Sequence, residues 1–137
     1  LFDKNQIKLE IDIDSEITYF GYKNELSQVL LSILNNSKDA LIENTMSNRL
    51  INISLIQSKN NLLLIIEDNA KGIKESILGN IFDPYFSTKN TKNGTGLGLY
   101  MSKIIINEHF KGNISANNRN DGLEIVIKIP KQKNKIT

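Results

Sequence analysis

The sequence predicts a two-layer α/β sandwich, in which a mixed, mostly antiparallel sheet carries helices on one face. Two observations predict this class: two long segments have apolar residues at helical spacing, and six shorter segments have the composition or the period-two alternation of strands. At 137 residues the chain has the length of one domain. We therefore expect a single domain over residues 1–137.

Two strands and a helix are predicted at the start of the chain. Ile7–Ile13 alternates apolar and polar residues, which is typical of a strand with one buried face, and Ile17–Tyr22 reads as a second, short strand. Leu26–Leu41 then carries its apolar residues along one helical stripe. Asn24 is the residue we expect to cap this helix.

The middle of the chain is predicted to form a β-hairpin. Ile51–Gln57 and Leu62–Glu67 are rich in β-forming residues, and the polar turn Lys59–Asn61 separates them. The second strand is apolar on both faces. It is therefore expected in the centre of the sheet.

A second long helix and a second hairpin are predicted to complete the domain. The helix covers Gly98–His109, and the hairpin strands cover Gly112–Ala116 and Leu123–Ile129. Pro130 is expected to end the last strand. The polar tail, residues 131–137, is expected to be frayed.

The composition excludes several classes of function. Without cysteine the chain has no disulfide framework or thiolate metal site, and a single histidine excludes an imidazole-rich metal cluster. A net charge of +2 argues against a protein that coats nucleic acid, so no nucleic-acid partner is expected. No apolar run approaches the ~18 residues of a membrane span, and no signal-peptide pattern opens the chain. We expect no direct membrane contact by this domain.

Polar residues on the first helix form the first candidate functional feature. Ser32, Asn36 and Asp39 are spaced i, i+4 and i+7, so they form a polar stripe beside the apolar one. Asn36 lies near enough to the apolar stripe to be partly buried, and a partly buried amide needs a hydrogen-bond or metal partner. By itself this pattern also fits an ordinary asparagine on a helix surface.

A carboxylate and a glycine follow the predicted central strand. In Asp68–Gly72 the carboxylate can accept a hydrogen bond from an amine at a pocket floor, and Gly72 lets the backbone approach a flat ligand closely. An ordinary Asx turn is the alternative. The whole polar segment Asp68–Gly98, with one short helix near Lys74–Asn80, is long for a compact domain. Such a loop is typically functional.

A glycine-rich segment opens the second long helix. In Gly94–Leu99 the alternating glycines expose N–H groups to phosphate oxygens, and the helix dipole adds to their attraction. The spacing is that of neither the dinucleotide fingerprint nor a Walker loop. Upstream, the aromatic residues of Phe82–Phe86 need something to pack against, such as a partner. Lys89 either offers a point charge to a phosphate or is a solvated loop lysine.

Taken in order, these segments resemble the catalytic ATP-binding domain of sensor histidine kinases. Leu30–Leu41 resembles the N box, Asp68–Ile73 the G1 box, Phe82–Phe86 the F box and Gly94–Leu99 the G2 box. The resemblance runs from about Asn24 to Pro130. It extends to the wider superfamily of type II topoisomerase, chaperone and mismatch-repair ATPases with the Bergerat fold.

The resemblance implies ATP and Mg²⁺ as ligands and assigns roles to individual residues. Asn36 matches the asparagine that binds Mg²⁺ between the phosphate oxygens, and Asp68 matches the carboxylate that accepts a hydrogen bond from the adenine amino group. Asn36 and Lys89 are the residues expected to serve catalysis. The residues implied in nucleotide binding are Asn36, Asp39, Ala40, Asp68, Gly72, Ile73, Lys89, Gly94, Thr95, Gly96, Leu97, Gly98 and Leu99.

Two positions depart from the family's pattern. Ala70 stands where the G1 box usually has its first glycine, a change that a small side chain should tolerate. Ser32 stands where the kinases often carry another asparagine and the ATPases a glutamate that activates water. A serine is no carboxylate base at neutral pH, which counts against autonomous ATP hydrolysis. Asp39 agrees with a common N-box variant and is expected to orient Asn36 or a metal-bound water.

The function implied is phosphoryl transfer. The domain is expected to bind Mg²⁺·ATP and to pass the γ-phosphate to a histidine on a dimeric helical domain of the same protein, for relay to the receiver domain of a response regulator. His109 lies at a helix end and is not expected to be the acceptor. Because the chain opens at Leu1 and not at Met, we expect a fragment of a longer protein. The resemblance implies that the acceptor hairpin precedes Leu1 and that this domain is cytoplasmic, in a parent that is either membrane-anchored or soluble. The alternatives are a superfamily ATPase, a non-catalytic nucleotide-binding or docking module, and a serine kinase.

Overall fold

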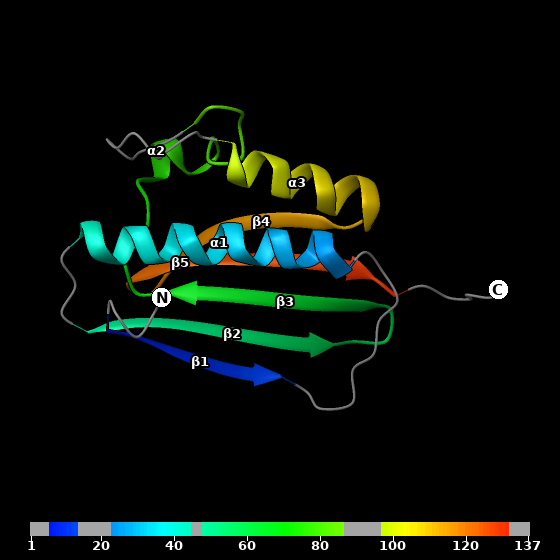
Figure 1. Ribbon diagram of the computed structural model, residues 1–137, viewed down its shortest axis with the longest axis horizontal. Helices are drawn as coiled ribbons and strands as arrows, with labels where there is room; N and C mark the ends of the chain where they lie inside the picture. The colour runs from blue at the N-terminus through cyan, green and yellow to red at the C-terminus, as the bar shows by residue number, and fades with distance from the viewer. Residues whose placement is uncertain (1–5, 14–22, 45–47, 87–96, 132–137) are drawn as a thin grey trace.

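The computed structural model describes residues 6–13, 23–44, 48–86 and 97–131. Five strands form one sheet in the order β1-β2-β3-β5-β4, with β1 and β2 parallel and the other neighbours antiparallel (Figure 1). The elements are β1 (Ile7–Ile13), α1 (Lys23–Glu43), β2 (Arg49–Gln57), β3 (Asn61–Asp68), α2 (Glu75–Leu78), α3 (Gly98–His109), β4 (Asn113–Arg119) and β5 (Gly122–Pro130). The predicted mixed, mostly antiparallel sheet is confirmed.

The predicted helices and hairpins occur close to their expected bounds. β3 lies between β2 and β5, as its two apolar faces predicted. The prediction for Asn24 is wrong, because α1 begins at Lys23 and Asn24 lies inside its first turn. The expected strand at residues 17–22 is outside the described part of the chain. Of the helices that the structure describes, none has the length and apolarity needed to cross a membrane.

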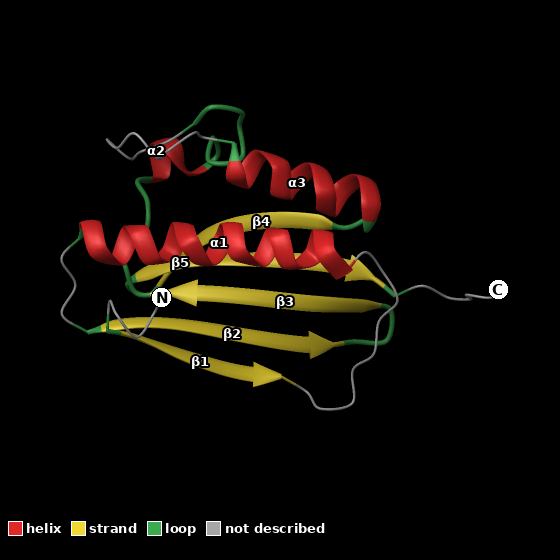
Figure 2. Ribbon diagram, viewed as in Figure 1, coloured by secondary structure: helices red, strands yellow, loops and turns green. Residues whose placement is uncertain are grey.

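The hydrophobic core lies between one face of the sheet and the helices. The strand register places Ile53, Ile66 and Ile125 side by side on this face, and all three are buried. Ile33 of α1 and Ile106 of α3 are fully buried against them. Figure 2 shows α1 running along the strands in front of β5, with α3 beside it. The expected helical layer on one face of the sheet is therefore present.

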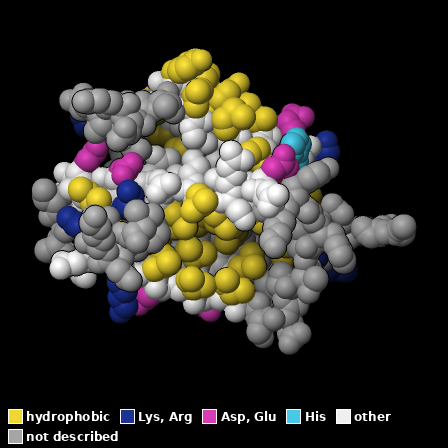
Figure 3. All heavy atoms as spheres, viewed as in Figure 1, with side chains coloured by type: hydrophobic (Ala, Val, Ile, Leu, Met, Phe, Trp, Pro, Cys, Tyr) yellow, Lys and Arg dark blue, Asp and Glu magenta, His cyan; other side chains and the backbone are white. Residues whose placement is uncertain are grey.

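The predicted buried face of β1 is wrong in all but its first residue. Ile7 is buried, but Leu9, Ile11 and Ile13 are 37%, 57% and 49% exposed. The parallel register aligns them with the core-facing residues of β2, yet β1 is an edge strand and α1 and α3 pack over β3 and β4. Apolar side chains therefore remain exposed, and Figure 3 shows an apolar patch over β1 and β2, below α1 in this view.

The orientation of α1 is tested by two substitutions two residues apart. Ile33 has no exposed surface, so Ile33→Ala should lower the free energy of unfolding by about 2–5 kcal/mol. Leu31 is 57% exposed, and Leu31→Ala should change it by less than about 1 kcal/mol. Urea unfolding measures both, and equal losses would contradict the packing of α1.

Candidate functional site

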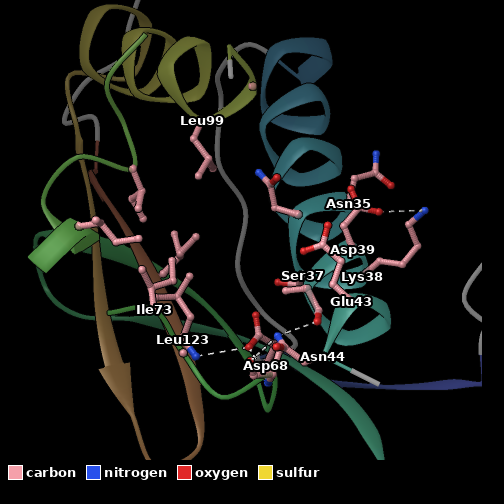
Figure 4. A pocket seen from close by; sticks show the side chains of 18 of the residues that line it. Asn35, Ser37, Lys38, Asp39, Glu43, Asn44, Asp68, Ile73, Leu99 and Leu123 are labelled. Carbon is pink, nitrogen blue, oxygen red and sulfur yellow. Dashed lines mark hydrogen bonds and ion pairs between the residues drawn. The ribbon is translucent and has the colours of Figure 1, made fainter. Parts of the chain in front are cut away.

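A cavity of about 990 Å³ lies between α1, the end of β3, the loop that follows it and the start of α3 (Figure 4). Its volume is within the range of small-molecule sites. Among the residues that line it are the predicted Asn36, Asp39, Ala40, Asp68, Gly72, Ile73, Gly98 and Leu99. The structure thus brings segments from three parts of the chain to one cavity.

Of the remaining predicted site residues, the structure describes Leu97 and leaves four undescribed. Leu97 precedes α3 and is described, but it does not line the cavity. Lys89, Gly94, Thr95 and Gly96 lie outside the described residues.

The carboxylate of Asp68 is fixed at the end of β3 by hydrogen bonds from two directions. Its Oδ1 accepts from the N–H of Ala70 at 3.0 Å, in its own loop, and from the N–H of Leu123 at 3.3 Å, in β5 (Figure 4). Burial raises the pKa of Asp68, and these two bonds and the Ser37 hydroxyl lower it by less. The cavity therefore holds a desolvated, well-oriented acceptor.

The β4–β5 hairpin reaches Asp68 because residue 122 is a glycine. A Cβ on Gly122 would lie 1.5 Å from the backbone oxygen of Asp68. No side chain fits at that separation. The close approach brings the N–H of Leu123 to the carboxylate.

The loop after Asp68 is tied to its surroundings by asparagine side chains. Asn44, at the end of α1, donates from Nδ2 to the backbone oxygen of Ala70 at 3.1 Å and to that of Ala40 at 2.9 Å. Asn69 donates from Nδ2 to the oxygen of Asn48 at 2.6 Å. Ala70 is 2% exposed, so its small side chain is accommodated in this loop, as the sequence analysis expected.

The polar stripe predicted on α1 faces the cavity. Ser32, Asn36 and Asp39 all line it, and the carboxylate of Asp39 lies 3.6 Å from Lys38 Nζ. Ser32 lies where α1 meets the start of α3: its Oγ would be 2.7 Å from a Cβ on Gly98. The departure at position 32 therefore puts a small hydroxyl at this contact between the two helices.

The first turn of α3 adds a positive pole to the same cavity. Leu97, the N-cap residue, makes no side-chain capping bond, and Gly98 and Leu99 line the cavity. The N–H groups at the start of a helix and the helix dipole attract anions. This end of the cavity thus suits a negatively charged group.

Sequence reasoning missed four residues that shape the site: Ser37, Asn44, Asn118 and Leu123. Ser37 is a serine within the apolar stripe of α1, and a buried hydroxyl needs a partner, so the pattern contained a usable signal. Leu123 acts through its backbone N–H, which no side-chain pattern marks. The asparagines do not stand out in this asparagine-rich sequence.

The model of the family described as histidine kinase-, DNA gyrase B- and HSP90-like ATPases matches residues 21–133. The chain belongs to this family, in which ATP is the nucleotide that is bound. The match and the fold confirm the resemblance stated from the sequence.

Two individual relatives are a two-component sensor and a kinase by name. The chain is 32% identical over 113 residues to the two-component sensor PprA of Pseudomonas aeruginosa, covering 80% of this chain and 12% of PprA. It is 30% identical over 125 residues to sporulation kinase B of Bacillus subtilis, and the match covers 90% of this chain and 28% of that kinase. The chain thus spans between about an eighth and just over a quarter of these relatives.

A solved structure shares the fold. The catalytic domain of histidine kinase ThkA superposes with a TM-score of 0.81 at 28% identity, covering 95% of this chain and 84% of that one. The predicted fold class is confirmed by this likeness.

The raised pKa of Asp68 predicts how stability varies with pH. The folded domain holds this proton more tightly than the unfolded chain, whose pKa is the ordinary 3.8. The carboxyl therefore contributes most stability below that value and loses it as the pH rises through the folded-state pKa. Asp68→Asn removes this loss, so the variant should gain stability relative to the wild type as the pH rises above about 4, as measured by urea unfolding.

The matched control is Asp83→Asn, since Asp83 is exposed and does not line the cavity. Its stability relative to the wild type should stay constant over the same range. If Asp68→Asn loses stability relative to the wild type as the pH rises, the direction of the Asp68 shift is wrong.

Proposed function

We propose that this chain binds Mg²⁺·ATP in the cavity and transfers the γ-phosphate to a histidine on a dimeric helical domain of the same protein. The observation that carries the proposal is the cavity itself, which Asn36, Asp68 and Gly98 share. The relatives support the reaction class, because PprA is a two-component sensor and sporulation kinase B is a kinase by name. The products are ADP and a phosphohistidine.

Asp68 supplies recognition of the base. Its carboxylate accepts a hydrogen bond from the exocyclic amine of adenine, whereas guanine presents an acceptor at the same position. A hydrogen bond to a charged group contributes about 1.5–3 kcal/mol. Ile73 and Leu123, which also line the cavity, give the base apolar surfaces to pack on. The pocket thereby prefers adenine.

Asn36 is the proposed protein ligand of Mg²⁺. The described residues include no group of three or more His, Cys, Asp or Glu side chains that could hold a metal alone. An amide oxygen nevertheless fits Mg²⁺, since this ion prefers oxygen donors and takes much of its shell from substrate phosphates and water. The role proposed for Asp39, which also lines the cavity, is to orient Asn36 or a metal-bound water. Bound Mg²⁺ would neutralise charge on the phosphate oxygens.

The residues of the glycine-rich segment and Lys89 complete the proposed phosphate site. The N–H groups of Gly94–Leu99 would close on the phosphates, and Lys89 would add a point charge. Gly98 and Leu99 line the cavity, which supports this assignment. The chain's part in the reaction is then to hold the triphosphate in line with its acceptor and to spread its charge.

The acceptor imidazole is itself the nucleophile, so the domain requires no strong base. Ser32 in the cavity lining agrees with this division, because an ATPase needs a carboxylate to activate water. Relay to an aspartate on a response regulator is proposed as the next step. ThkA was solved in complex with the response regulator TrrA, and that structure matches this chain at 26% identity with a TM-score of 0.75. A cytoplasmic location is part of the same proposal.

Nucleotide selectivity tests the role of Asp68. Calorimetry with ATP, ADP and GTP, with and without Mg²⁺, should show that the wild type prefers adenine. Asp68→Asn should weaken ATP binding about 10- to 100-fold, because an amide donor faces the adenine amine. Asp83→Asn should bind like the wild type. Equal wild-type affinity for ATP and GTP would contradict the proposal.

Phosphohistidine formation tests the reaction. In the protein that carries both this domain and the acceptor helices, Asn36→Ala should abolish Mg²⁺-dependent autophosphorylation, while Asn107→Ala, on the exposed side of α3, should leave it intact. Normal activity of Asn36→Ala would remove Asn36 from the mechanism. Steady phosphate release by this chain alone would instead favour an ATPase. Nucleotide binding without phosphohistidine formation would favour a binding or docking module.

A further inference from the structure

Asn118, which lies outside the predicted site, holds one wall of the cavity in place. Its side chain, on β4, contacts the backbone of Ile73 twice: Oδ1 accepts from the N–H of Ile73 at 2.8 Å, and Nδ2 donates to the oxygen of Ile73 at 2.6 Å. Nδ2 also donates to Glu75 Oε2 at 2.9 Å, at the start of α2. A single side chain therefore fixes both Ile73 and the helix that follows.

These three bonds require a carboxamide. Asparagine offers one carbonyl acceptor and two N–H donors, and all of them are used here. An aspartate at this position would accept from Ile73 but would donate to neither of the other two oxygens. The contact set thus specifies the residue type.

The backbone before Ile73 is bent so that this contact is made. Lys71 and Gly72 both have positive φ angles, 71° and 75°, and the N–H of Lys71 donates to the oxygen of Asp121 at 2.6 Å. A Cβ on Gly72 would lie 2.4 Å from Asn118 Oδ1. Glycine at position 72 is therefore needed for the approach of Asn118 as well as for the backbone angle.

The same hairpin fixes both edges of the base end of the cavity. Asn118 and Leu123 are paired residues of β4 and β5. Leu123 donates its N–H to Asp68, and Asn118 binds Ile73. Asp68 and Ile73 both line the cavity, so the hairpin sets the separation between the acceptor and the apolar wall.

We infer that Asn118 is a positioning residue for nucleotide selectivity: it holds Ile73 at the distance from Asp68 that fits an adenine. The inference rests on the proposed function. α1 and the start of α3, which would hold the phosphates, make none of the three bonds. Loss of Asn118 should therefore weaken recognition of the base and leave the contribution of the γ-phosphate unchanged.

Calorimetry of this chain with ATP, ADP and GTP tests the inference. Asn118→Ala should lower the affinity for ATP and for ADP by the same factor, about tenfold, and should narrow the preference for ATP over GTP.

Asn118→Asp should also weaken nucleotide binding, because the new carboxylate faces the carboxylate of Glu75. Adding Glu75→Gln to Asn118→Asp should recover part of the affinity, since the new amide can donate to that carboxylate. The control is Asn113→Asp, the same substitution at an exposed position of β4, which should bind like the wild type.

Hydrogen exchange gives a readout that does not depend on nucleotide. The amide of Ile73 should exchange at least about tenfold faster in Asn118→Ala, while the amide of Ile127 in β5 keeps its wild-type rate. Unchanged adenine preference in a folded Asn118→Ala, or an affinity loss that differs between ATP and ADP, would overturn the inference. If Asn118→Ala does not fold, the absence of rescue by Glu75→Gln overturns it. A wild type that binds no adenine nucleotide would refute the proposed function itself, and with it this inference, whereas the other outcomes refute the inference alone.

Discussion

The architecture of the site depends on one carboxylate held at the end of a buried strand. Asp68 is the last residue of β3, and a desolvated carboxylate is costly unless hydrogen-bond donors surround it. Its donors come from its own loop, through Ala70, and from a hairpin more than fifty residues later, through Leu123. Satisfying Asp68 therefore requires the loop and the hairpin to close on each other, which the glycine at position 122 permits.

The two ends of the cavity are built by different parts of the fold. Strands and the β4–β5 hairpin fix the end where Asp68 and Ile73 lie, which is the end proposed to hold the base. Helices form the other end, where Asn36 of α1 and Gly98 of α3 line the cavity. Both helices pack on the same core, which fixes one end relative to the other. Catalysis by positioning needs such a rigid relation between separately built subsites.

Three features of the domain are explained better by function than by stability. Burial of Asp68 raises its pKa and so reduces stability at neutral pH, and such perturbed groups are concentrated at functional sites. Tyr85 is 76% exposed in the F-box segment, with a positive φ of 64°. The cavity lining has a serine, Ser32, where hydrolysis would need a carboxylate. These features agree with the proposed function, in which this domain binds the nucleotide and another domain supplies the nucleophile.

The sequence by itself determined the helices, the hairpins and the motif order, because an element buried on one side has apolar residues at a regular spacing. The polar stripe of Asn36 and the strand-end position of Asp68 follow from the same local rules. Only the tertiary structure decided that Ile11 is exposed, since burial of an edge strand depends on how far the helical layer extends. It alone revealed Asn118 and Leu123, whose bonds span 45 and 55 residues. Contacts made through the backbone over such separations leave no periodic trace in a sequence.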